Sequence, residues 1–282
     1  MSRLKRVYME ITNRCNLRCS FCPGTRRPPR DMTAGEFALL AGRARPYADY
    51  FYLHVMGEPL LHPELGEILE ICAGLDAKVC LTTNGVLLPG QQETLLPASA
   101  LYKCSVSLHS MEGNGAGELT GYLQSVWDFA VQAAGRGIIC ALRLWNMGGA
   151  DRRNREILDF LAERTGVHPL TCPQPRRGSW RLGEQLYLEQ AERFDWPDLT
   201  APESGTAFCR ALRDQIAVLA DGTAVPCCLD HEGDIPLGNL FCQTLPEILD
   251  SPRARALYEG FSRRQPSEAL CRRCGYATRF GM

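Results

Sequence analysis

The 282-residue sequence lacks an excess of charge of either sign, because 31 lysines and arginines stand against 32 aspartates and glutamates. It also lacks runs of like charge, internal repeats and low-complexity tracts. A nucleic-acid-binding surface or an acidic tail would produce such a run or imbalance. We therefore expect no nucleic-acid partner, and a chain long enough to bury a substantial core.

Signals for export or membrane insertion are missing as well. The apolar stretch after the basic start "MSRLKR" is too short and too interrupted for a signal peptide, and no later segment approaches the ~18 unbroken apolar residues of a membrane span. We expect a cytoplasmic protein with no membrane partner and with reduced thiols. In that compartment, clustered cysteines among the 14 in this chain are expected to bind metal rather than to form disulfides.

The first ~175 residues alternate short apolar runs with amphipathic segments. The apolar runs predict six strands, at 7–11, 50–55, 78–83, 104–109, 138–145 and, more weakly, 167–170. The amphipathic segments predict helices at 33–44, 62–75, 118–134 and 154–166, the first with Thr33 and Glu36 as a capping box. Strands alternating with helices indicate an α/β fold with parallel pairing.

A second region follows a Pro-, Gly- and Arg-rich interruption, "CPQPRRGSWRLGEQ". There "QIAVLADGTAVPCC" predicts a hairpin that turns at Asp221 and Gly222, and residues 245–261 predict one helix. We expect a first domain at 1–180, a linker at 181–205 and a small α+β domain at 206–282.

Three cysteines lie close together near the start, in "CNLRCSFC", as Cys15, Cys19 and Cys22. A [4Fe-4S] cluster has four irons, and each takes one external ligand, usually a cysteine thiolate. Three cysteines would leave one iron free to bind a small molecule. The alternatives are a partial zinc site or three incidental thiols.

The C-x3-C-x2-C spacing, in the loop after a first predicted strand, resembles the signature of the radical S-adenosylmethionine (radical SAM) superfamily. That resemblance implies a partial (β/α)6 barrel and a [4Fe-4S] cluster whose open iron binds S-adenosylmethionine. It also implies reductive cleavage to a 5′-deoxyadenosyl radical, which abstracts hydrogen from a substrate, with a flavodoxin- or ferredoxin-type reductant.

Four further cysteines form a second set: Cys209, Cys227, Cys271 and Cys274. Four thiolates suit structural zinc or a fully ligated [4Fe-4S] cluster, and the residues alone leave both open. The arrangement, with "GNLFCQTLPEIL", resembles the Twitch domain, a shortened form of the SPASM auxiliary-cluster domain. That resemblance favours a second [4Fe-4S] cluster, and no third is expected because no cysteine follows Cys274.

The other cysteines have simpler interpretations. Cys80, Cys104 and Cys140 lie in predicted strands and suit small core positions. Cys228 adjoins Cys227 and is an alternative ligand, whereas Cys172 has either a structural or a reactive role, of which we favour the structural one.

Several residues at predicted strand ends match the family's S-adenosylmethionine-binding positions. "MGEP" resembles the GGE motif, so Gly57 would approach the methionine moiety and Glu58 would receive its ammonium group, with Met56 in place of the first glycine. Phe21 precedes the third cysteine, as in the family signature. Active sites of parallel barrels lie at these strand ends.

Further candidates follow the later strands. By resemblance, Ser107 would meet the ribose hydroxyls and Arg143 the carboxylate of S-adenosylmethionine. Asn84 is either a further cosubstrate contact or a turn residue before Gly85. His109 is more readily structural than substrate-binding, and no catalytic acid or base is assigned.

The resemblance implies an oxidoreductase in which the auxiliary cluster accepts the electron left after hydrogen abstraction, as in Twitch-type dehydrogenases that oxidise a cyclitol or sugar carbinol. Modification of a ribosomally made peptide is the alternative, less favoured because we expect no leader-binding domain before the barrel. The molybdenum-cofactor cyclase ranks lower still, because its auxiliary cluster has three cysteines and its end motif is missing here. A non-enzymatic electron or metal carrier would not need the strand-end motifs.

Overall fold

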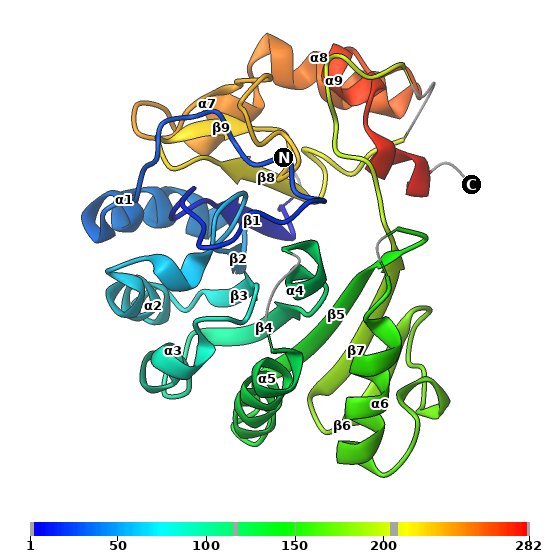
Figure 1. Cartoon of the computed structure of the whole chain (residues 1–282). Helices are drawn as coiled ribbons and strands as arrows, with labels where there is room; N and C mark the ends of the chain where they lie inside the picture. Colours follow the sequence, from blue (N-terminus) through cyan, green and yellow to red (C-terminus); the bar gives the residue numbers. More distant parts are fainter. Residues whose placement is uncertain (1–2, 115–117, 150, 204–207, 281–282) are drawn as a thin grey trace.

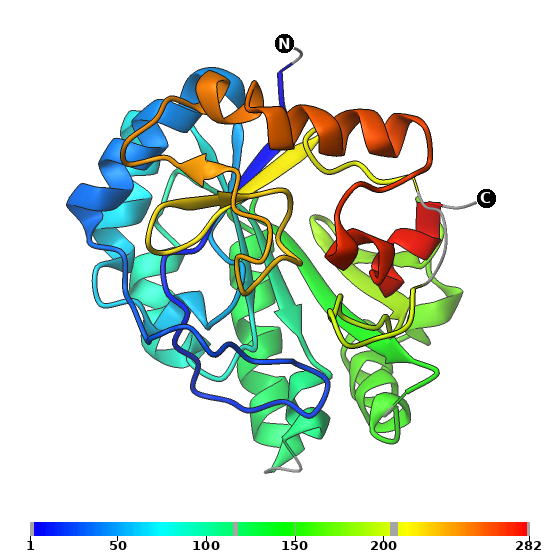
Figure 2. The same ribbon diagram turned by 90° about the horizontal axis from the view of Figure 1, so that it is seen from above.

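The computed structural model describes residues 3–114, 118–149, 151–203 and 208–280. Its strands form one curved sheet in the order β10-β9-β8-β1-β2-β3-β4-β5-β7-β6, with helices on the convex side (Figure 1). Viewed from above, the strands curve around the centre of the molecule and helices lie outside them (Figure 2). The α/β class and the partial barrel expected from the sequence are both present.

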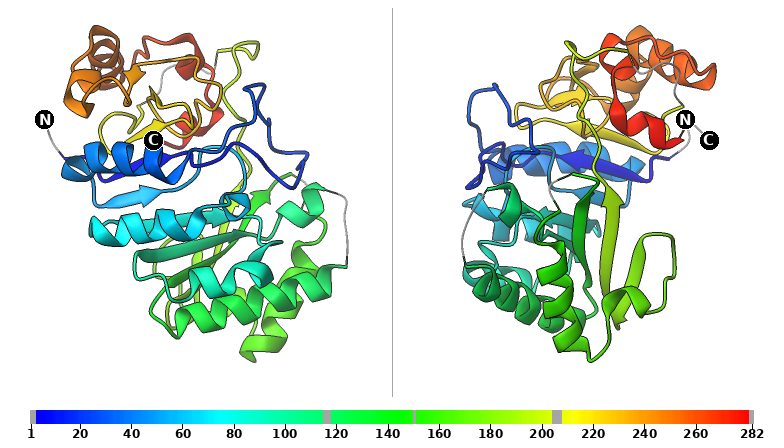
Figure 3. Two further views of the ribbon diagram at one scale, coloured as in Figure 1. Left: turned by 90° about the vertical axis from the view of Figure 1, so that its left-hand side faces the viewer. Right: turned by 45° about the vertical axis from the view of Figure 1, so that its right-hand side comes forward.

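Six strands form the parallel part of the barrel: β1 (Arg6–Met9), β2 (Tyr50–Tyr52), β3 (Lys78–Thr83), β4 (Leu101–Ser107), β5 (Ile139–Met147) and β7 (Leu186–Glu192). β8 (Gln215–Val218) also pairs in parallel with β1, while β9 (Thr223–Val225), β10 (Gly238–Asn239) and β6 (Ser179–Gly183) are antiparallel to their neighbours. The C-terminal region thus extends the barrel sheet beyond β1, as two further views show (Figure 3).

The helices that follow the strands are α1 (Ala34–Ala44), α2 (Leu65–Gly74), α3 (Leu88–Leu95), α5 (Leu119–Ala134) and α6 (Asn154–Thr165). The other helices are α4 (Ser110–Gly113), α7 (Leu245–Leu249), α8 (Pro252–Ser262) and α9 (Ala269–Arg272). The 3-10 turns span Arg45–Tyr47, Pro59–Leu61, Pro169–Thr171 and Gly275–Phe280.

Local sequence signals explain the ends of several helices. The Thr33 side chain accepts from the backbone N–H of Glu36, whose carboxylate accepts from that of Thr33, so the predicted capping box begins α1. Gly166 ends α6 with a φ of 74°, in the left-handed region that glycine occupies readily.

Alternation along β1 assigns its two faces. Val7 and Met9 are buried against the helices in the main core, whereas Tyr8 between them belongs to a separate cluster with Val55 and Ala217. Successive side chains of a strand point to opposite faces. Residues of the Tyr8 face therefore line the barrel interior, where the cavity described below lies.

The expected sixth strand at 167–170 is wrong. Pro169 begins a 3-10 turn there, and proline cannot donate a ladder hydrogen bond. The sixth parallel strand is β7, which lies within the predicted linker 181–205 and pairs with β5. Residues 186–192 of that segment are therefore barrel wall, and the predicted boundary at 205/206 falls outside the described residues.

In the C-terminal region, β8 and β9 form the predicted hairpin, with Gly222 at a φ of 83°. The single helix expected at 245–261 is wrong, because α7 and α8 are separate. The Ser251 side chain accepts from Ala254 N–H and Pro252 occupies the first turn, so a new helix begins at this point. No helix within the described ranges is both long and apolar enough to cross a bilayer.

Candidate functional site

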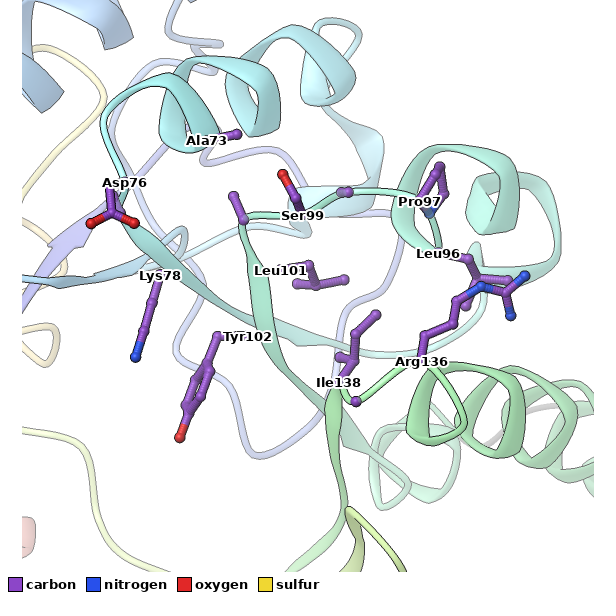
Figure 4. A pocket seen from close by; sticks show the side chains of 14 residues that line it. Ala73, Asp76, Lys78, Leu96, Pro97, Ser99, Leu101, Tyr102, Arg136 and Ile138 are labelled. Atoms are coloured by element: carbon purple, nitrogen blue, oxygen red, sulfur yellow. The ribbon is translucent and has the colours of Figure 1, made fainter.

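A cavity of ≈ 1440 Å³ occupies the barrel interior and extends to the C-terminal region. Its lining includes all seven predicted ligand cysteines, Cys15, Cys19, Cys22, Cys209, Cys227, Cys271 and Cys274. A smaller cavity of ≈ 520 Å³ lies at the amino ends of β3 and β4, beside Lys78, Tyr102 and Arg136 (Figure 4). None of the predicted site residues lines the smaller cavity, so the larger one is the candidate site.

A buried ion pair holds the loop that carries the first three cysteines. Glu10, just after β1, has a fully buried carboxylate that accepts two hydrogen bonds from Arg27, at 2.7 and 2.6 Å. The same carboxylate accepts from the backbone N–H groups of Met56 (3.1 Å) and Ala220 (3.0 Å). Glu10 thus joins the cysteine loop to the segment after β2 and to the β8–β9 turn.

The three N-terminal thiols lie within electrostatic reach of one another. Burial raises the pKa of Cys15, Cys19 and Cys22, and neighbouring thiols raise it further. Asn114 donates to Cys19 Sγ at 3.1 Å and accepts from Arg18 N–H at 2.8 Å, so the end of α4 supports this loop.

The second set of thiols comes from three segments. Cys209 precedes β8, Cys227 follows β9, and Cys271 and Cys274 lie in and just after α9. Burial raises the pKa of Cys227 well above its usual value, and Cys228, Cys209, Cys271 and Cys274 raise it further in that order. The structure therefore gathers the four predicted ligands around one place.

The two sets of cysteine thiols can be compared with what a zinc ion and an iron-sulfur cluster require. All 14 cysteines are free. Within the described part of the chain, no three His, Cys, Asp or Glu side chains converge closely enough to bind a single ion. Thiolates are the usual ligands of a [4Fe-4S] cluster, each binding a different iron, so the sets of three and four thiols fit such clusters by their chemistry.

Gly57 occupies a position that no other residue could take without strain. Its φ is 79°, and a Cβ there would lie 2.4 Å from Thr12 O and 2.8 Å from Arg14 O. The backbone after β2 therefore packs directly on the cysteine loop. Met56 in place of the family's first glycine is buried and leaves this approach intact.

Glu58 is buried at the edge of the same cavity. Its carboxylate accepts from Leu60 N–H at 3.1 Å and from Asn84 N–H at 2.8 Å. Burial raises the pKa of Glu58, and these two backbone donors oppose that shift. These two hydrogen bonds fix the orientation of the Glu58 carboxylate as a hydrogen-bond acceptor.

Asn84 serves as a turn residue and also as a bridge. Its Oδ1 accepts from Val86 N–H at 3.0 Å, as in an Asx turn, which agrees with the turn interpretation. Its Nδ2 donates to Asn16 Oδ1 at 2.8 Å, which connects the end of β3 to the cysteine loop.

Arg143 takes part in a network that sequence reasoning missed. It donates to Glu189 Oε2 at 3.4 Å and to Thr82 Oγ1 at 3.2 Å, and its guanidinium lies 4.2 Å from the Trp145 ring centroid. Glu189 also pairs with Lys103 at 3.0 Å. Ser107, at the end of β4, lines the cavity.

His109 and Phe21 pack together, with ring centroids 4.9 Å apart. His109 Nδ1 lies 3.1 Å from Arg143 O, and burial lowers the pKa of His109 to about 4. These contacts support the structural interpretation of His109. Through this ring contact, Phe21 packs the cysteine loop against the residues that follow β4.

The other cysteines separate by location. Cys80, Cys104 and Cys140 are buried, as expected for core positions. Cys228 lies on the cavity side beside Tyr8, and Cys172 is half-buried and does not line the cavity.

Glu10 was available as a signal, because it is a charged residue inside an otherwise apolar predicted strand, whereas Glu189 lies in the segment expected to be a linker. Such residues are rarely buried unless they are paired. Their partners Arg27 and Lys103 lie 17 and 86 residues away along the chain, and no spacing rule connects them.

Sequence comparisons match residues 9–161 to the radical SAM superfamily and residues 209–275 to the SPASM iron-sulfur cluster-binding domain. A protein of Synechococcus sp. (strain CC9605) named GTP 3′,8-cyclase is 33% identical over 288 residues, covering 80% of this chain and 81% of that protein. Another protein of that name, from Chlorobaculum tepidum, is 38% identical over 101 residues, which are 33% of this chain and 29% of that protein. The match to Chlorobaculum tepidum thus spans less than a third of that protein.

Solved structures share the fold. BtrN in complex with AdoMet and 2-DOIA aligns over 97% of this chain and 94% of its own, with a TM-score of 0.57 and 16% identity. Streptococcus suis SuiB bound to precursor peptide SuiA aligns over 98% of this chain and 70% of its own, with a TM-score of 0.63 and 16% identity. The chain belongs to the radical SAM superfamily and carries a C-terminal SPASM iron-sulfur domain.

Proposed function

We propose that this radical SAM enzyme oxidises a small-molecule substrate by two electrons, with an auxiliary [4Fe-4S] cluster as the acceptor of the second electron. The observation that carries the proposal is that one cavity is lined by both cysteine sets, the three N-terminal thiols and the four C-terminal ones. A closed cluster cannot bind substrate but can take an electron, so its placement beside a substrate cavity suits that role.

When bound, the N-terminal cluster and S-adenosylmethionine supply the hydrogen-abstracting radical. In this proposal Cys15, Cys19 and Cys22 hold that cluster, and Cys209, Cys227, Cys271 and Cys274 hold the auxiliary one. Glu58 receives the cosubstrate's ammonium group beside Gly57, where only glycine fits. Phe21, Asn84, Ser107 and Arg143 complete its surroundings, and a flavodoxin- or ferredoxin-type protein supplies the reducing electron.

Two other reactions have specific support. The SuiB structure contains a precursor peptide, which supports peptide modification as one alternative. The relatives named GTP 3′,8-cyclase support a nucleotide cyclase as another. The gathering of four rather than three thiols in the C-terminal region favours the oxidase, because the cyclase needs an open iron there.

The test is an anaerobic assay of the reconstituted protein, reduced with dithionite and supplied with S-adenosylmethionine. We expect 5′-deoxyadenosine to form, and the variant with Cys15, Cys19 and Cys22 replaced by alanine to form none. A matched variant, Cys80→Ala, removes a buried thiol outside both sets and should still form it. No product from well-folded wild-type protein loaded with iron would overturn the proposal.

A further inference from the structure

Four side chains from β1 and the segment at β2 form a polar cluster on the wall of the large cavity. Arg6, Tyr8, Tyr52 and His54, here termed the Arg6–His54 cluster, all line it. The Tyr8 ring centroid lies 4.8 Å from that of Tyr52 and 5.4 Å from that of His54. The Arg6 guanidinium lies 5.6 Å from the Tyr52 ring centroid. The cluster thus combines a cation and an imidazole with aromatic walls.

Two buried polar atoms of this cluster have no hydrogen-bond partner. Across the described residues three buried side-chain N or O atoms are unpartnered, and two of them are Arg6 Nε and His54 Nδ1. Both residues flank Tyr52. A buried donor without a partner costs free energy, so native proteins seldom leave two together without a functional reason.

The charge of the cavity wall is one-sided. Ten lysine or arginine side chains line the cavity, against three acidic ones, Glu58, Glu189 and Asp214. Glu189 pairs with Lys103, Arg143 and Arg176, and Asp214 pairs with Lys5 and Arg210. Among the described residues no carboxylate pairs with Arg6. A partly buried guanidinium without an acid is stabilised by an anion.

His54 contributes a neutral donor rather than a second charge. Burial, with the nearby charge of Arg143, lowers the pKa of His54 to about 3. A neutral imidazole carries one N–H, and the tautomer with hydrogen on Nδ1 can donate to an oxygen. Arg6 Nε–H and His54 Nδ1–H are thus two donors, each available to an oxygen that only accepts.

We propose that the Arg6–His54 cluster is a substrate subsite that binds an oxyanion, a carboxylate or a phosphate group of the small molecule. This rests on the proposed function in so far as the occupant is the substrate. Arg6 supplies charge and one donor, His54 supplies the second donor, and the Tyr8 and Tyr52 rings pack on the adjoining carbon skeleton. The substrate is then an anionic small molecule rather than a neutral polyol.

The experiment titrates the iron-loaded protein with inorganic phosphate, acetate or glycerol by isothermal calorimetry at fixed ionic strength. Saturating S-adenosylmethionine is present so that its own carboxylate site is filled. We expect phosphate or acetate to bind and glycerol not to bind. The anion that binds with the higher affinity shows whether the subsite takes a phosphate or a carboxylate group of the substrate. Arg6→Gln should weaken anion binding about tenfold, as loss of a charged hydrogen bond does.

Two further variants separate binding from folding. His54→Phe keeps the ring but removes the unpartnered nitrogen, so it should weaken anion binding several-fold while raising the melting temperature of the anion-free protein. Arg6→Lys keeps the charge without the Nε–H and is measured if Arg6→Gln does not fold; it too should bind the anion more weakly. Arg155→Gln, which removes an arginine with 92% exposed side chain, should leave binding unchanged.

Anion binding that is absent in the wild type, or that is equal in wild type and the folded Arg6 variant, would overturn the subsite. Neither outcome concerns formation of 5′-deoxyadenosine, which is measured without added phosphate or acetate. A failed subsite is therefore distinguishable from a failed proposed function.

Discussion

Glu10 and Arg27 form a bidentate ion pair next to the cysteine loop, with the Glu10 side chain fully buried and that of Arg27 14% exposed. Because Glu10 also accepts from Met56 and Ala220, one carboxylate positions three segments around the cavity. The loop that carries Cys15, Cys19 and Cys22 is thus fixed by a residue outside its motif.

Glu10→Gln should lower the free energy of unfolding by about 3–5 kcal/mol, because it leaves the Arg27 guanidinium buried without its charge partner. Urea denaturation of the iron-loaded protein measures this. The control is Arg14→Met, whose pair with Asp31 is 60% exposed on the arginine side and should contribute less than about 1 kcal/mol. Equal effects of the two substitutions would show that the Glu10 pair has no special role.

Glu58→Gln should weaken S-adenosylmethionine binding about tenfold, since an amide cannot offset the charge of the ammonium group. The iron content should stay unchanged. Equilibrium binding to the iron-loaded protein tests this, with the exposed Glu67→Gln as the matched substitution. Unaltered affinity in the Glu58 variant would remove this residue from the site.

The two cysteine sets should be separable by mutation, because they come from different parts of the chain. Alanine at Cys15, Cys19 and Cys22 should abolish S-adenosylmethionine cleavage and leave the absorbance of the other cluster. Alanine at Cys271 and Cys274 should leave some uncoupled 5′-deoxyadenosine but stop substrate turnover, since the second electron then lacks an acceptor. Circular dichroism must first show that the C-terminal region still folds, because small metal-binding regions often depend on their metal. Wild-type turnover by the folded double variant would mean that the auxiliary cluster is structural.

Acid should destabilise the protein through its buried histidines. Burial lowers the pKa of His54 to about 3 and that of His109 to about 4. The unfolded chain, with histidine pKa values near about 6.5, binds more protons as the pH falls below that value, so the free energy of unfolding decreases by up to ~1.4 kcal/mol per pH unit for each histidine. The decrease from His109 ends near pH 4, and that from His54 near pH 3.

Urea denaturation between about pH 7.5 and 5 measures how steeply the free energy of unfolding falls with pH. The variant His54→Phe should have a smaller slope, because it lacks the contribution of one of the two histidines. A slope that is the same in the variant would show that His54 titrates normally in the folded protein.

Local signals predicted much of this fold and site. The capping box at Thr33, the turn at Gly222 and the strands at the parallel core depend on neighbours in sequence, and they lie where expected. The strand β7 was missed because its Pro- and Arg-rich approach resembles a linker, and only pairing with β5 shows that it is part of the barrel. Glu189, Arg6 and His54 were missed for the same reason, since burial and long-range partners decide their roles.

Mössbauer spectroscopy of protein reconstituted with ⁵⁷Fe, recorded with and without S-adenosylmethionine, can distinguish the two proposed clusters. We expect about eight irons per chain in two cubane clusters, with the cosubstrate altering the signal of one iron in one cluster and leaving the other cluster unchanged. About four irons with stoichiometric zinc at the C-terminal cysteines, or a cosubstrate-induced change in both clusters, would contradict it.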